Sequence, residues 1–321
     1  MTINDRENVS RTIVTEFVLL GFSNLQEMEL PLFVLFLTMY MLTIIGNALV
    51  ILLIHLDSRL HTPMYYFLSN LSWLEIIITT TVTPKLLSLL ISKTNTISAF
   101  GCIVQVTMYF LAGVTEVLLL GAMSVDRYLA ICNPLRYTAI MSNQVCMLMM
   151  LSCWLGSILC IVISAIFKSG LPYCGPNVID HFFCERIPLT NLICADTTLI
   201  QLVEFILASF VLLTSVSVTT VSYLFIIITV MRMPSAESRK KAFSTCSSHI
   251  TVASLYYGSS MFIYVRPAGS TSMDFNKVAT VLNTVVTPLL NPIIYSFRNK
   301  VVKDVMSDAV KRIGDKLVLR V

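Results

Sequence analysis

MSVDRYLAICNPLRY (Met123–Tyr137) ends a long apolar segment with an acid and a base side by side, Asp126 and Arg127. The apolar segment predicts that this pair lies at a membrane surface. Charged side chains are costly in hydrocarbon, so an Asp–Arg pair at that depth either anchors a helix at the boundary or forms a switch. The pair alone does not choose between these two roles.

The composition of the chain indicates an integral membrane protein. Of its 321 residues, 56% are hydrophobic and only 12% are charged, about half the charged fraction of a soluble domain. The net charge of +4 is modest. No run of Lys and Arg suggests a nucleic-acid partner, and none is expected.

Seven apolar segments reach the roughly 20 residues that a helix needs to cross a bilayer. We therefore predict an all-α membrane protein, a bundle of seven transmembrane helices. The expected spans are Leu30–Ile54, Met64–Leu90, Phe100–Ile131, Val145–Phe167, Leu199–Met231, Ala242–Val265 and Val278–Phe297. No internal repeat is found, which argues against a transporter built from duplicated halves.

The distribution of basic residues predicts the orientation in the membrane. With the amino terminus outside, 14 of the 22 Lys and Arg residues fall on the cytoplasmic side and eight fall outside, as the positive-inside rule requires. The expected parts are an extracellular tail (residues 1–29), the seven-helix domain (30–297) and a cytoplasmic tail (298–321). Alternating charged and apolar residues after Phe297 predict a short amphipathic helix on the inner leaflet.

The amino-terminal tail does not look like a cleavable signal, because its charges are scattered and no short apolar core precedes a cleavage site. Asn8-Val9-Ser10 is a glycosylation acceptor on this external tail, so Asn8 is the expected modified residue. Asn70-Leu71-Ser72 fits the same pattern but falls inside the second span, out of reach of glycosyltransferases.

Several strings in order resemble one family. The opening stretch continues as Ala130-Ile131-Cys132-Asn133-Pro134, the second span opens with His61-Thr62-Pro63-Met64-Tyr65-Tyr66-Phe67, the sixth begins with Lys240-Lys241-Ala242-Phe243-Ser244-Thr245-Cys246, and the seventh ends with Asn291-Pro292-Ile293-Ile294-Tyr295. Together they resemble the olfactory branch of the rhodopsin-like G-protein-coupled receptors. The departures are small: Ser124-Val125 replaces the common Ala-Tyr, and Glu75 stands where Asp is usual.

Four cysteines, Cys102, Cys174, Cys184 and Cys194, fall on the outer, oxidising side. Four cysteines allow three pairings, and the residues alone do not select one. The resemblance implies the pairs Cys102–Cys184 and Cys174–Cys194. The remaining cysteines are expected to pack as small apolar residues.

Two acids, Glu75 and Glu116, lie deep in the expected spans, and carboxylates at that depth are functional candidates. One interpretation is a pair of neutral, hydrogen-bonded acids. The other, which the resemblance favours, is a sodium site between them. Asn47 and Asn291 are expected to join Glu75 in a polar cluster, which the resemblance implies is a hinge between resting and active states.

The resemblance implies a ligand site between the third, fifth and sixth spans. Tyr257, Ser260 and Tyr264 share one helix face with aromatic rings and hydroxyl groups, which suits a small apolar ligand. The alternative is that these tyrosines pack against a neighbouring helix, and Glu204 could equally reach the outer interface. The full predicted set is Tyr109, Phe110, Gly113, Val114, Glu204, Leu207, Ala208, Val211, Tyr257, Ser260, Met261 and Tyr264.

The resemblance also implies a cytoplasmic switch that meets a G-protein. Its expected residues are Asp126, Arg127, Tyr223, Lys240, Lys241, Asn291, Pro292 and Tyr295. The implied function is an odorant receptor of the plasma membrane, in sensory cilia, that binds a volatile ligand and raises cyclic AMP through a stimulatory G-protein. The alternatives are a chemoreceptor of the same class for another small ligand, or a transporter. The four histidines are dispersed, so no enzyme is expected.

Overall fold

The computed structural model describes residues 14–22, 27–92, 95–173, 177–264, 273–298, 301–308 and 311. At residues 238, 241, 243–245, 248, 273–274 and 295–298 it describes the backbone only.

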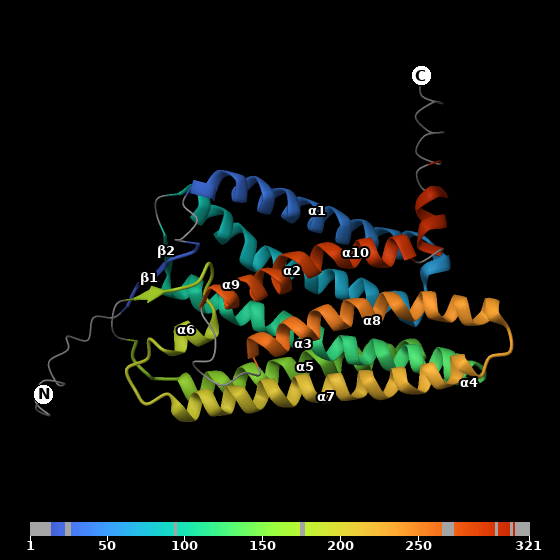
Figure 1. Ribbon diagram of the computed structural model, residues 1–321. Helices are drawn as coiled ribbons and strands as arrows, with labels where there is room; N and C mark the ends of the chain where they lie inside the picture. Colours follow the sequence, from blue (N-terminus) through green and yellow to red (C-terminus); the bar gives the residue numbers. More distant parts are fainter. Residues whose placement is uncertain are drawn as a thin grey trace, which may run out of the picture.

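The described part of the chain forms seven long helical rods, which lie side by side (Figure 1). They are α1 (Glu29–Leu56), α2 (Pro63–Ile91), α3 (Ala99–Cys132), α5 (Asn143–Lys168), α7 (Thr198–Met231), α8 (Ala236–Tyr264), and a seventh rod made of α9 (Met273–Val281), η4 (Leu282–Val286) and α10 (Thr287–Arg298). The predicted seven-helix bundle is therefore confirmed. Each expected span lies within a rod, except that Val265 is outside the described residues.

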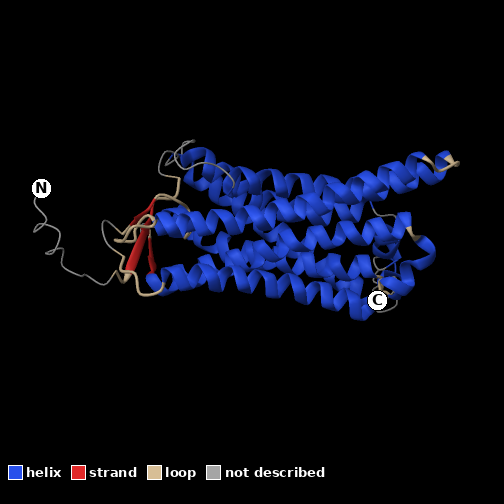
Figure 2. Ribbon diagram, turned by 90° about the horizontal axis from the view of Figure 1, so that it is seen from below, coloured by secondary structure: helices blue, strands red, loops and turns tan. Residues whose placement is uncertain are grey.

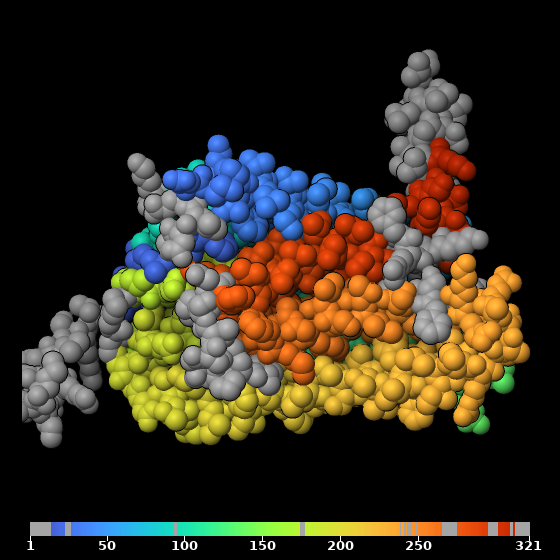
Figure 3. Space-filling view, viewed as in Figure 1, coloured from blue at the N-terminus to red at the C-terminus, as the bar shows by residue number. Residues whose placement is uncertain are grey.

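Six of these rods are long and apolar enough to cross a membrane, judged by length and composition over the described residues. The remaining rod, α8, is of similar length but begins with a charged and polar stretch. It lies between α7 and α10 in the space-filling view, where α1, α10, α8 and α7 follow one another across one face (Figure 3). The polar start of α8 extends beyond the neighbouring rods at one end of the bundle (Figure 1).

Short polar residues set where several rods begin. The Ser98 hydroxyl accepts a hydrogen bond from the backbone N–H of Gly101 at the start of α3, and Ser142 accepts one from Val145 at the start of α5. Such caps satisfy N–H groups that have no partner within the helix. Pro63 begins α2 and Pro134 begins the short α4 (Pro134–Ile140), where the missing N–H of proline costs nothing.

A small β-sheet, which the sequence did not predict, closes one end of the bundle (Figure 2). The strand β1 (Glu16–Leu19) pairs antiparallel with β2 (Thr96–Ser98) and parallel with β3 (Val178–Ile179). Phe17 and Leu19 point inward and are buried with Cys102 and Cys184. The short helix α6 (Arg186–Thr190) follows β3 in the same loop. This end of the bundle therefore has its own small apolar core, separate from the main core between the helices.

The opposite end carries α4 and residues 301–308, which are helical as the amphipathic pattern predicted. Val302 and Val305 are buried there, while Val301, Lys303 and Asp304 are exposed. Arg59 bonds both Asp57 and Asp308 at 2.9 Å, so the loop after α1 is tied to this last helix.

Candidate functional site

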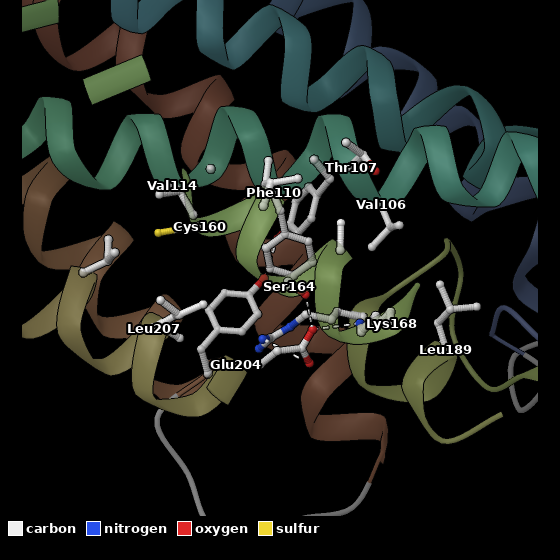
Figure 4. Close-up of a pocket in the computed structure, with 18 of the residues that line it drawn as sticks. Val106, Thr107, Phe110, Val114, Cys160, Ser164, Lys168, Leu189, Glu204 and Leu207 are labelled. Carbon is white, nitrogen blue, oxygen red and sulfur yellow. Dashed lines mark hydrogen bonds and ion pairs between the residues drawn. The ribbon is translucent and has the colours of Figure 1, made fainter. Parts of the chain in front are cut away.

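A cavity of about 450 Å³ lies between α3, α5, α7 and α8, near the end that carries the sheet. Its walls are mostly apolar, with Val106, Phe110 and Val114 projecting from α3 and Leu207 from α7 (Figure 4). Of the predicted ligand residues, those that line it are Tyr109, Phe110, Gly113, Val114, Glu204, Leu207, Ala208, Val211, Ser260 and Tyr264.

Two predicted lining residues, Tyr257 and Met261, do not line the cavity. The hydroxyl of Tyr257 lies 2.6 Å from the Ser215 hydroxyl and 3.1 Å from that of Thr219, both on α7. The packing alternative was therefore right for Tyr257. The inward face of α8 runs through residues 256, 260 and 264, so Ser260 and Tyr264 lie on the predicted face, and Tyr257 points about 100° away from its neighbour Tyr256 around the helix.

Tyr256, which the sequence reasoning missed, lines the cavity in place of Tyr257. Its hydroxyl donates a hydrogen bond of 3.1 Å to the carbonyl of Gly113 on α3. A second bond joins the same helices, because the hydroxyls of Tyr109 and Tyr264 share a hydrogen bond of 3.0 Å. Two tyrosines of α8 are thus bonded to α3 across the wall of the cavity.

One wall of the cavity is charged. Glu204 is 5% exposed; its Oε1 lies 2.7 Å from Lys168 Nζ and accepts a hydrogen bond of 2.6 Å from the Ser164 hydroxyl. Its Oε2 lies 3.4 Å from Arg186. Figure 4 shows Glu204, Lys168 and Ser164 pointing toward one another from α7 and α5. Glu204 therefore faces the cavity and not the outer interface.

Lys168, Ser164 and Arg186 were not predicted as site residues. Lys168 directly follows the fourth expected span and is the last residue of α5, a position where a basic residue is ordinarily an interfacial anchor. Arg186 follows Cys184 by two positions, and the disulfide to Cys102 on α3 brings that loop over the cavity. That spacing from Cys184 was the signal in the sequence that could have found Arg186.

The expected polar cluster is present in part, because Asn291 and Glu75 are hydrogen-bonded, whereas Asn47 bonds backbone carbonyl groups. The Asn291 amide donates a hydrogen bond to Glu75 Oε1, and Asn47 Nδ2 donates one of 3.2 Å to the carbonyl of Pro288. Glu116 lies beside Glu75. Both oxygens of Glu116 and Oε2 of Glu75 are buried without a hydrogen-bond partner among the described residues.

Three buried carboxyl oxygens of this kind fit a small cation, because hard cations prefer oxygen ligands. They fit protons equally, as two neutral acids. The described residues contain no group of three or more His, Cys, Asp and Glu side chains that could hold a metal. The arrangement is therefore compatible with a sodium site between Glu75 and Glu116 and with a pair of neutral acids.

At the far end of α3, Asp126 and Arg127 are paired. Arg127 Nε donates a hydrogen bond of 2.8 Å to Asp126 Oδ2, and the Tyr137 hydroxyl of α4 donates one of 2.7 Å to Oδ1. Asp126 is 1% exposed. Close by, the Tyr223 hydroxyl of α7 lies 2.6 Å from His249 Nδ1 of α8. A hydrogen-bonded pair thus joins α7 to α8 at the end of the bundle where Arg127 lies.

The remaining predicted residues are placed as follows. Cys102 and Cys184 form the predicted disulfide. Cys194 is disulfide-bonded, but Cys174 lies outside the described residues, so its pairing is untested. Lys240 is exposed near the start of α8, and Pro292 is buried in α10. Asn8 and the side chains of Lys241 and Tyr295 lie outside the described residues.

Comparisons with known proteins agree with one another. The family model described as "Olfactory receptor" matches residues 36–313. Olfactory receptor 6E1 of Mus musculus is 49% identical over 302 residues, covering 94% of this chain and 96% of that protein. Olfactory receptor 6J1 of Homo sapiens is 49% identical over 300 residues, covering 94% and 86%. Olfactory receptor 6S1 of Homo sapiens is 47% identical over 300 residues, covering 93% and 91%.

Proposed function

This chain belongs to the olfactory receptor family, and from that premise we propose that it binds a small, mostly apolar odorant in the cavity between α3, α5, α7 and α8. Binding activates a stimulatory heterotrimeric G-protein and raises cyclic AMP. The observation that carries the proposal is the cavity of about 450 Å³. Small-molecule sites ordinarily measure 300–1,000 Å³, with apolar walls and a few placed polar groups.

The proposed mechanism is a ligand-biased equilibrium between two states of the bundle. A ligand in the cavity contacts α8 near Tyr256 and Tyr264, whose hydroxyls bond to α3. Changing these bonds changes how α8 packs on α3. At its other end α8 holds His249 against Tyr223, so the same movement opens the bundle where Arg127 lies.

In the active state Arg127 leaves Asp126 and meets the G-protein. The exposed Lys240, together with Lys241, belongs to the surface that the G-protein contacts. Asn291, Pro292 and Tyr295 form the hinge of the seventh rod. Glu75 and Glu116 would hold a sodium ion when one is bound, and it would stabilise the pair by balancing their charge.

The protein is a multi-pass membrane protein, and we place it in the plasma membrane of sensory cilia with residues 1–29 outside and residues 298–321 in the cytoplasm. This orientation puts the sheet, the Cys102–Cys184 disulfide and Asn8 on the oxidising side. With this orientation the cavity lies near the outer side of the membrane, so an odorant would enter it from the outer medium.

A ligand screen tests this function. Cells that express the receptor at the surface are exposed to a chemically unbiased odorant library, with cyclic AMP as the readout and with cells lacking the receptor as the control. The proposal expects agonists that act only in receptor-expressing cells. A receptor that reaches the surface and gives no response to any compound would contradict it.

A further inference from the structure

The charged wall of the cavity indicates which odorants fit. We propose that the agonists of this receptor carry an oxygen acceptor at one end of an apolar body, most favourably a carboxylate and next a carbonyl group, and that this head group binds Arg186 and Lys168. This inference rests on the proposed function, because it names the ligand class of the same cavity.

The first support is the balance of charge. Three charged side chains line the described wall: Lys168, Arg186 and Glu204. Two cations thus face one carboxylate. Glu185, beside Arg186, does not line the cavity. Among the described residues that line the cavity, cationic side chains therefore outnumber anionic ones, and an anionic or acceptor head group would balance this difference.

The second support is the supply of free donors. Arg186 Nε is buried and has no hydrogen-bond partner among the described residues. The contact of Arg186 with Glu204 is loose at 3.4 Å, longer than an ordinary charge-assisted hydrogen bond. Lys168 carries three donors, and one of them meets Glu204 at 2.7 Å. A head group that accepts hydrogen bonds would satisfy donors that the protein leaves unsatisfied.

The third support is the position of the guanidinium group. Arg186 lies 5.2 Å from the ring centroid of Phe110 and 5.8 Å from that of Tyr264. Cations bind over aromatic faces in this way, so the two rings hold Arg186 at the cavity. Both rings line the cavity as well. A ligand that bonds Arg186 would thus place its apolar body against the rings that link α3 to α8.

The same geometry disfavours two other ligand classes. An amine would add a third cation beside Lys168 and Arg186, and it would have to displace Lys168 from Glu204, the carboxylate that lines the cavity. A pure hydrocarbon would bury the donors of Arg186 without a partner, which is unfavourable. Amines and hydrocarbons are therefore expected to be weak agonists.

The first test compares head groups on one carbon skeleton. It begins with the strongest agonist from the unbiased screen and prepares the carboxylate, aldehyde, primary amine and plain hydrocarbon of that skeleton. Because a bond to a charged donor is lost, the amine and hydrocarbon are expected to be roughly 10- to 100-fold less potent than the carboxylate. An amine or hydrocarbon as potent as the carboxylate would overturn the proposal. A screen without any agonist would instead overturn the proposed function.

The second test uses substitutions with opposite expected signs, normalised to surface staining. Arg186→Gln is expected to lower carboxylate potency by roughly 10- to 100-fold and to leave the hydrocarbon unchanged. Glu204→Gln is expected to raise carboxylate potency, because the competing anion is removed. A purely structural ion pair would instead make both substitutions reduce surface level and lower every response.

Lys277→Gln is the matched control, since Lys277 pairs with Asp180 at 2.7 Å and does not line the cavity; its carboxylate potency should match the wild type. Arg186→Lys, which keeps the charge and loses the planar fork, serves if Arg186→Gln fails to reach the surface. The carboxylate potency of Arg186→Lys is expected to lie between that of the wild type and a complete loss of response. Equal carboxylate potency in Arg186→Lys and the wild type, or lower carboxylate potency in Glu204→Gln, would overturn the proposal.

Discussion

Asn47 of α1 donates a hydrogen bond of 3.2 Å to the carbonyl oxygen of Pro288, 241 residues further along the chain. In a regular helix that carbonyl would accept from the N–H of residue 292, but residue 292 is proline and has no N–H. Asn47 therefore supplies the bond that Pro292 removes. Gly46 permits the approach, because a Cβ there would lie 3.1 Å from Pro292 Cγ.

Asn47→Leu should destabilise the receptor, because it leaves a buried carbonyl without a partner. The expected cost is about 1–3 kcal/mol, seen as a lower thermal unfolding midpoint of the purified protein in detergent. Thr38→Ala on the same helix removes only an exposed local bond to Val34 and should leave the midpoint unchanged. An Asn47→Leu midpoint equal to that of the wild type would show that water or another group serves the carbonyl.

The outer loop should be sensitive to acid through His181. This side chain is 1% exposed, and burial, with a smaller contribution from Lys277, lowers its pKa from 6.5 to about 3. Above pH 6.5 the folded and unfolded states are both neutral at this residue. As the pH falls from 6.5 toward 3, the unfolded state binds a proton that the folded state does not, so stability is lost.

The measurement is the unfolding midpoint at pH 7.5 and pH 5 for the wild type and for His181→Asn. The wild type should lose up to about 1.4 kcal/mol for each pH unit below 6.5, and the variant should lose less. Identical pH dependence in the two proteins would mean that His181 is solvated or partnered.

Arg127→Ala should abolish agonist-driven cyclic AMP while the protein still reaches the surface, because the account gives Arg127 the contact with the G-protein. Arg136→Ala is the matched control, since Arg136 is a nearby exposed residue on α4 with no role in the switch. Full signalling by Arg127→Ala would remove this residue from the mechanism.

Tyr109 and Tyr264 should act as a unit. Phe at either position removes the same hydroxyl–hydroxyl bond, worth about 0.5–1.5 kcal/mol. We expect each single substitution to change agonist potency by roughly two- to tenfold. The double substitution should change it by about the same amount as either single one. If the potency change of the double variant equals the product of the two single changes, each hydroxyl contacts the ligand separately.

The sequence predicted the helices well because span length and apolar composition are local properties. The Cys102–Cys184 bond and ten of the residues that line the cavity followed from the family resemblance and helix periodicity. The sequence could not predict that Tyr256 and not Tyr257 faces inward, since adjacent tyrosines suit either rotation of α8. Two further features depend on contacts between residues that are far apart in the sequence, so no local pattern predicts them. They are the pairing of Glu204 with Lys168 and Arg186, and the pairing of β1 with β2 and β3.

The central claim is that ligand binds in the cavity between α3, α5, α7 and α8, and cavity filling tests it most directly. Leu207 lines the cavity, while Leu213 on the same helix is 50% exposed and faces away from the bundle core. Agonist dose–response curves, normalised to surface staining, compare Leu207→Trp with Leu213→Trp. The account predicts that Leu207→Trp loses the response at normal surface level and that Leu213→Trp keeps it. Full potency in Leu207→Trp for every agonist would contradict the claim.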